Sequence, residues 1–160
     1  MIFDDDREDL CMTMYRKFGQ GMAVLCCVAM FILAIVYVFV NGFSNVNEES
    51  GEIIYFYEYI NFQSSLLIAL SFLVSAVANG CAGEFPQIAT GISVLPLVMT
   101  FYEMAIGNMN FVAAAVILLL SLIHFASNAI EWYDMWQAKK KAKEEASQKA
   151  AQETAQEPAQ

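Results

Sequence analysis

Long apolar segments separated by short polar ones dominate the chain. Residues 22–40 form an unbroken run of 19 apolar residues, and at 1.5 Å per residue this run is long enough to cross a hydrocarbon core of about 30 Å. Three further apolar stretches follow it. The pattern therefore predicts four membrane-spanning helices, at about 20–41, 61–79, 86–106 and 110–132.

Turn-forming residues separate the four predicted spans. The connections are NGFSNVNEESGE after the first span, NGCAGEFP after the second and the short IGNMN after the third. Short connections favour antiparallel neighbours. We therefore expect an all-α, polytopic integral membrane protein whose four transmembrane helices pack as an antiparallel bundle.

The composition agrees with a membrane protein and narrows the function. Hydrophobic residues make up 58% of the chain and charged residues 16%, whereas a soluble domain is about half apolar and about a quarter charged. A net charge of −9 argues against a nucleic-acid partner, which needs a basic surface. No phosphate-binding glycine loop, nucleophile elbow, paired catalytic carboxylates or haem motif is present. We expect the lipid bilayer as partner, no cofactor, no catalytic residue and no enzymatic activity.

The basic residues set the expected orientation. Arg16 and Lys17 flank the first span, a lysine cluster at 139–143 follows the last, and 18–138 contains no basic residue. The positive-inside rule then places both termini in the cytoplasm, which four crossings satisfy. The first apolar run exceeds a signal peptide's usual length and lacks a small-x-small cleavage site, so we expect it to stay as a membrane anchor.

Three regions are expected. Residues 1–17 form a cytoplasmic segment whose apolar residues at helical spacing are typical of an interfacial helix. Residues 18–136 form the membrane domain. Residues 137–160 form a charged Ala/Gln/Glu/Lys cytoplasmic tail, which we expect to extend the fourth helix for two or three turns and then to be disordered.

Small and polar residues form one stripe at three-and-four spacing on each predicted span, so each helix has a face that avoids lipid. In chain order the stripes are Ala23, Cys27, Met30, Ala34, Tyr37 and Asn41; Ser64, Ile68, Ser71, Ser75 and Asn79; Pro86, Thr90, Ser93, Pro96, Thr100, Glu103 and Gly107; and Ala114, Ile117, Ser121, His124, Asn128 and Glu131. The ordinary interpretation is close helix packing, with hydroxyls bonded to their own backbone. The alternative is a polar interior that conducts an ion or holds a polar ligand.

Five residues are candidates for ion or ligand binding: Glu103, His124, Asn128, Glu131 and Thr100. Ionisable residues inside a membrane are expensive and often functional. Glu103 and His124 differ in expected depth by on the order of 15 to 20 Å, so they are not expected to pair. The ordinary interpretation of Glu103 is a solvated carboxylate near the headgroups.

His124 falls at about the expected depth of Cys27. Neither a C-x-x-C nor an H-x-x-x-H pair occurs, so we expect no metal site and favour a histidine hydrogen-bonded to a neighbouring helix. Asn128, Glu131 and Asp134 are expected to form a polar cytoplasmic exit of the fourth helix whose charges reach water.

Three functions follow from these observations. The favoured one is a small non-enzymatic accessory or assembly subunit of a membrane complex, with a protein partner or a homo-oligomer. The second is an oligomeric transporter or channel protomer for a proton, cation or small solute, using Glu103. The third is a membrane-embedded enzyme acting on lipid or quinone, using His124 with Cys27.

Overall fold

Four α-helices make up most of the protein. The computed structural model describes residues 5–82 and 85–156, and in these the helices are α1 (Asp5–Asn41), α2 (Ile60–Cys81), α3 (Pro86–Ala105) and α4 (Phe111–Gln156). Each is long and apolar enough to cross a membrane. The predicted four helices of membrane-spanning length and composition are therefore confirmed, and they are compatible with a small multi-pass membrane protein.

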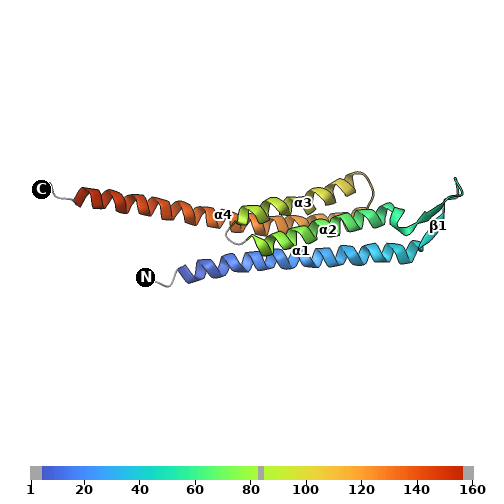
Figure 1. Ribbon diagram of the computed structural model, residues 1–160, viewed down its shortest axis with the longest axis horizontal. Helices are drawn as coiled ribbons and strands as arrows, with labels where there is room; N and C mark the ends of the chain where they lie inside the picture. Colours follow the sequence, from blue (N-terminus) through green and yellow to red (C-terminus); the bar gives the residue numbers. More distant parts are fainter. Residues whose placement is uncertain (1–4, 83–84, 157–160) are drawn as a thin grey trace.

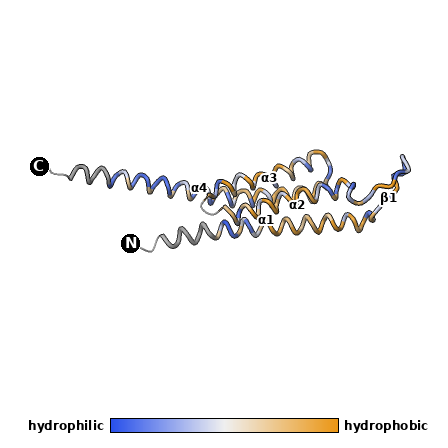
Figure 2. The backbone as a smooth tube through the Cα atoms, viewed as in Figure 1, coloured by the Kyte–Doolittle hydropathy of each residue, from blue (hydrophilic) through white to orange (hydrophobic). Residues whose placement is uncertain are grey.

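The helices lie side by side, and the start of α1 and the end of α4 are at the same end of the molecule (Figure 1). Both α1 and α3 contact α2 and α4. We call the end that carries the start of α1 the terminal end, and the opposite end, which carries the β1–β2 hairpin, the hairpin end. Figure 2 shows apolar residues along the side-by-side section, and polar residues at the tip of the hairpin and along α4 between that section and the residues drawn in grey.

The helix limits agree with the predicted spans for α2 and α3, but α1 and α4 are longer. Helix α1 begins at Asp5 and is continuous with the first span, because no proline interrupts residues 5–41. Residues 5–17 of the segment expected as an interfacial helix belong to this helix, and residues 1–4 lie outside the described residues. Helix α4 continues to Gln156, further than the expected two or three turns, since Ala, Lys, Glu and Gln all favour helix.

The connection between α1 and α2 contains structure that the sequence pattern did not predict. Strand β1 (Ser44–Val46) pairs antiparallel with β2 (Ile53–Tyr55), and the 3-10 helix η1 (Phe56–Glu58) follows. The amide of Gly51 donates to the carbonyl of Asn47 at 2.8 Å, which closes the turn between the strands. Gly51 has φ of +71°, a conformation that favours glycine. Strands of three residues are too short to show a clear alternation.

The predicted lipid-avoiding stripes are confirmed as the buried faces of the helices, with three exceptions at the hairpin end. Tyr37 is half-buried, while Asn41 and Gly107 are exposed. Asn41 is the last residue of α1, and Gly107 lies in the turn after α3, so both lie outside the packed section. Large apolar side chains such as Phe39, which is 75% exposed, face outward, as expected for a lipid-facing surface.

An apolar layer occupies the middle of the interior. Met30 of α1, Ile68 and Phe72 of α2, and Ala114 and Ile117 of α4 are buried together in it. In α2, Ile68 and Phe72 lie between the buried serines at 64 and 75. The layer lies between the levels of Ser64 and Ser75, and Ser71, which is buried within it on α2, donates its hydroxyl to its own helix.

Candidate functional site

Buried serine and threonine hydroxyls differ in their hydrogen-bond partners. In the described part of the chain, six donate to a carbonyl three or four residues earlier in their own helix: Ser71, Thr90, Ser93, Thr100, Ser121 and Ser127. Ser64 and Ser75 instead bond to a side chain of another helix. Thr90 donates in addition to a backbone carbonyl of α4, and among the described residues Ser65 Oγ has no partner. Ser64 and Ser75 therefore mark where interior polar side chains connect helices.

Near the hairpin end, Glu103 is buried and hydrogen-bonded, so the expectation of a solvated carboxylate is wrong. Its side chain is 3% exposed. Ser64 Oγ donates to Glu103 Oε2 at 2.5 Å, and Asn108 Nδ2 donates to the same oxygen at 3.0 Å. The amide of Asn108 also donates to the Glu103 carbonyl at 3.1 Å. The α3–α4 turn therefore folds over the carboxylate, and we call these three residues the Glu103 site.

Thr100 lies one turn before Glu103 on α3 and is fully buried. Its hydroxyl donates to the carbonyl of Pro96 at 2.7 Å. This bond is local to α3, as in the ordinary interpretation of a threonine within a span. Thr100 therefore contributes to the packing beside Glu103, and its hydroxyl is not bonded to the carboxylate.

Near the terminal end, His124 connects α4 to α2. His124 Nε2 and Ser75 Oγ are hydrogen-bonded at 2.7 Å, and the ring of Phe72 lies 6.2 Å from the imidazole, centroid to centroid. The backbone of Gly19 lies beside the same ring, but within residues 5–82 and 85–156 no atom is in hydrogen-bond geometry with Nδ1. His124 is thus bonded to a neighbouring helix, through Ser75 and not Cys27.

Asn128 lies one turn beyond His124 on α4, where both α1 and α3 approach α4. The hydroxyl of Thr90 donates to the Asn128 carbonyl at 2.9 Å, which joins α3 to α4. A Cβ atom on Gly19 would lie 2.8 Å from Ser127 Oγ and 2.9 Å from Asn128 Oδ1. Glycine therefore permits the close approach of α1 to α4 at this level.

Glu131 forms a buried ion pair, so the expectation that it reaches water is wrong. Arg16 Nη2 lies 2.7 Å from Glu131 Oε1. The Glu131 side chain is 2% exposed, while that of Arg16 is 25% exposed. Arg16, which the sequence pattern assigned to membrane orientation, therefore also connects α1 to α4. With Ser75, Asn79, His124 and Asn128, this pair makes up what we call the terminal polar layer.

The Glu103 site and the terminal polar layer are separate. Ser64 and Ser75, which contact Glu103 and His124 respectively, are eleven residues apart on α2 and thus about 16 Å apart along its axis. This agrees with the depth difference expected from sequence. Because of this distance, a direct proton transfer from one to the other is not available in this structure.

Sequence reasoning missed several members of both sites. Ser64, Ser75 and Asn79 lay on the predicted buried stripe of α2, but spacing alone did not distinguish them from serines bonded to their own backbone. Arg16 and Gly19 were missed because each lies at the start of the first span, where a basic residue and a glycine are ordinary.

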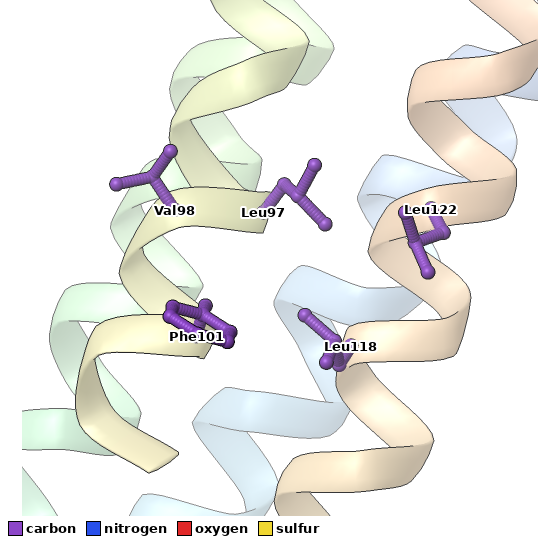
Figure 3. Close-up of a pocket in the computed structure, with 5 residues that line it drawn as sticks. All are labelled: Leu97, Val98, Phe101, Leu118 and Leu122. Carbon is purple, nitrogen blue, oxygen red and sulfur yellow. The ribbon is translucent and has the colours of Figure 1, made fainter. Parts of the chain in front are cut away.

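Two surface grooves between helices are apolar. One lies between α3 and α4, where Leu97 and Leu122 point toward each other (Figure 3), and its remaining lining residues are Val98, Phe101 and Leu118. The other lies between α1 and α4 and includes Met30 and Ile117. Neither groove contains a predicted site residue, and their lining suits lipid acyl chains.

Among the described residues, no group of three or more His, Cys, Asp or Glu side chains is placed to hold a metal ion. The polar interior thus provides single carboxylates, amides, hydroxyls and one imidazole. In comparisons with known proteins, the chain matched no family model, no curated protein and no solved structure.

Proposed function

We propose that this chain is a non-enzymatic accessory or assembly subunit of a membrane complex, with both termini in the cytoplasm. The observation that carries this proposal is the part of α4 beyond the membrane-spanning section. It projects past the other helices at the terminal end (Figure 1), and residues 139–149 are exposed throughout. It offers a partner a long helical surface outside the membrane.

The chemistry of this extension supports a binding role. A helix that is polar on all sides is usually stabilised by many charge pairs at i,i+4 or by a neighbouring structure. Among the described side chains, the one such pair is Lys140 with Glu144, at 4.0 Å, and an exposed pair contributes little. A protein partner that packs against residues 139–149 would supply the missing interactions.

The interior supports a structural role. Most buried hydroxyls are bonded to their own helices, including Ser71 and Ser121, which lie between the Glu103 site and the terminal polar layer. Interhelical hydrogen bonds and small buried residues are the interactions that hold helices together in lipid. These features suit a rigid helical scaffold better than a continuous polar pathway.

Extraction in a mild detergent tests the proposal. The full chain is compared with a chain that ends at Gln137, and the mass and composition of both particles are measured. We expect a stoichiometric second polypeptide with the full chain and its loss from the shortened one, while the unfolding temperature of the membrane domain is retained. A particle made only of copies of this chain would contradict the accessory role.

A second candidate function is that of a small oligomeric transporter or channel protomer for a proton, cation or small solute. The observation that favours it is the burial of the Glu103 carboxylate, because such groups inside membranes are often functional. Its test is flux in reconstituted vesicles, with Ser121→Ala as a matched control. We expect Glu103→Gln to abolish flux if this role holds, and unchanged flux would remove it.

A further inference from the structure

Two fully buried carboxamides in the terminal polar layer lack hydrogen-bond partners. Asn79 is 0% exposed and Asn128 is 1% exposed. Among the described residues, neither the amide oxygen nor the amide nitrogen of either side chain has a partner, and the same holds for Glu131 Oε2 and Arg16 Nε. Buried polar atoms in proteins are almost always paired, and each one left unpaired is destabilising.

The two carboxamides lie at the same level. Helices α2 and α4 both run from the hairpin end to the terminal end (Figure 1), and Ser75 is hydrogen-bonded to His124 across them. Asn79 and Asn128 are each four residues further along, which is one turn, or about 6 Å, toward the terminal end. Both amides are therefore placed on the interior faces immediately beyond the Ser75–His124 bond.

The Arg16–Glu131 ion pair lies between this level and the surface. Glu131 is three residues beyond Asn128 on α4 and is buried, whereas the Arg16 side chain is 25% exposed. The pair therefore extends from the polar interior to the surface at the terminal end. On the opposite side, the apolar layer closes the interior with Ile68 and Phe72.

The unpartnered atoms indicate what kind of ligand would fit. Each carboxamide has one acceptor and two donor hydrogens, Glu131 Oε2 accepts, and Arg16 Nε donates. The charges of Arg16 and Glu131 cancel, so a bound ion would add an uncompensated charge in a low-dielectric interior. A neutral molecule that both donates and accepts hydrogen bonds meets both requirements.

We propose that Asn79 and Asn128 form a binding site for small uncharged molecules that donate and accept hydrogen bonds, entered from the terminal end past Arg16. Water and a small organic solute share this chemistry. The site is independent of the accessory role, because it lies inside the membrane domain and does not involve residues 139–149.

Thiol accessibility tests the site directly. In full-length protein with its native cysteines replaced by alanine, Asn79→Cys is compared with Ile68→Cys, which is equally buried but lies in the apolar layer. Methyl methanethiosulfonate, a small uncharged reagent, is the probe. We expect the thiol at position 79 to react at least about tenfold faster, since a thiolate forms only where polar molecules enter. Equal rates at the two positions would overturn the proposal.

A second comparison identifies the occupant. Native mass spectrometry of the unmodified particle is compared with that of Asn79→Leu. If the native protein carries a bound organic molecule that Asn79→Leu lacks, the occupant is a solute. If the thiol at position 79 reacts fast but no organic molecule is bound, the occupant is water. The unfolding temperature should fall in Asn79→Leu and stay unchanged in Ser121→Ala. If the unfolding temperature of Asn79→Leu rises instead, the Asn79 amide is unpaired and binds no molecule in the native protein. This result would overturn the proposal.

Discussion

The interior holds a buried carboxylate near each end, and the two are stabilised in different ways. Glu103 accepts hydrogen bonds from two neutral side chains, Ser64 and Asn108. Glu131 instead pairs with the guanidinium of Arg16. The first arrangement leaves the charge of an ionised carboxylate in place, whereas the second cancels it.

This difference assigns different chemistry to the two ends. An uncompensated carboxylate attracts a proton or cation, which is why Glu103 is the residue to test for transport. A charge-balanced layer with unpaired amides suits a neutral ligand. The hydrogen bonds around Glu103 also join α2 to the α3–α4 turn, while the Arg16–Glu131 pair joins the first helix to the last. Stability measurements on variants can separate these roles.

The largest effect is expected from Arg16→Leu. It leaves the Glu131 carboxylate buried without a cation, and breaking a buried pair in this way costs about 3–5 kcal/mol. Glu131→Leu should cost less, because the Arg16 side chain is partly exposed and can reach water. Denaturant unfolding in detergent measures both. A cost below about 1 kcal/mol for Arg16→Leu would instead indicate a solvent-screened pair.

Glu103→Ala should have the next largest effect. The substitution removes the acceptor for Ser64 and Asn108, and leaving buried donors unpaired costs about 1–3 kcal/mol. Glu103→Gln should cost less, since its amide oxygen can accept the same bonds. The same unfolding assay compares the two variants. If Glu103→Ala and Glu103→Gln lose the same stability, the contribution of Glu103 to stability does not come from these hydrogen bonds.

Gly19→Ala should destabilise the contact between α1 and α4. The added Cβ would lie within 3 Å of Ser127 Oγ and Asn128 Oδ1, and such overpacking costs about 1–3 kcal/mol. Gly21→Ala is the matched control, because nothing lies within 4 Å of its added Cβ. Alanine favours helix over glycine by about 0.8–1.0 kcal/mol, so Gly21→Ala should raise the unfolding temperature. A rise in both variants would exclude the close approach at Gly19.

The smallest effects distinguish the two kinds of buried serine. Ser75→Ala removes the partner of His124 Nε2 and should cost about 1 kcal/mol. Ser121→Ala removes only a bond to its own helix, so we expect a change within about 0.5 kcal/mol. Thermal unfolding of both variants under one detergent condition gives the difference. If Ser121→Ala is the more destabilising, the connection between α2 and α4 is not through Ser75.

The candidate site was partly predictable from sequence. The periodicity of small and polar residues placed Glu103, His124, Asn128 and Glu131 on helix faces that avoid lipid, and each of them is buried. The expectations that Glu103 is solvated and that Glu131 reaches water were wrong. The same periodicity did not show that Glu131 meets Arg16 or that Ser64 meets Glu103. Ser64 and Ser71 look alike in sequence, yet only Ser64 bonds to another helix. The hairpin was missed because strands of three residues give little pattern.

The sequence by itself determined the number of spans, their approximate limits and the face of each helix that avoids lipid. These properties depend on residue hydropathy and on the 3.6-residue period of a single helix. Only the tertiary structure decided the partners of the interior polar groups. The hydrogen bond between Ser75 and His124, for example, forms only if two helices have the right relative depth and rotation. These are set by close packing of the helices. They cannot be inferred from the sequence pattern of either helix, because the two residues are 49 positions apart.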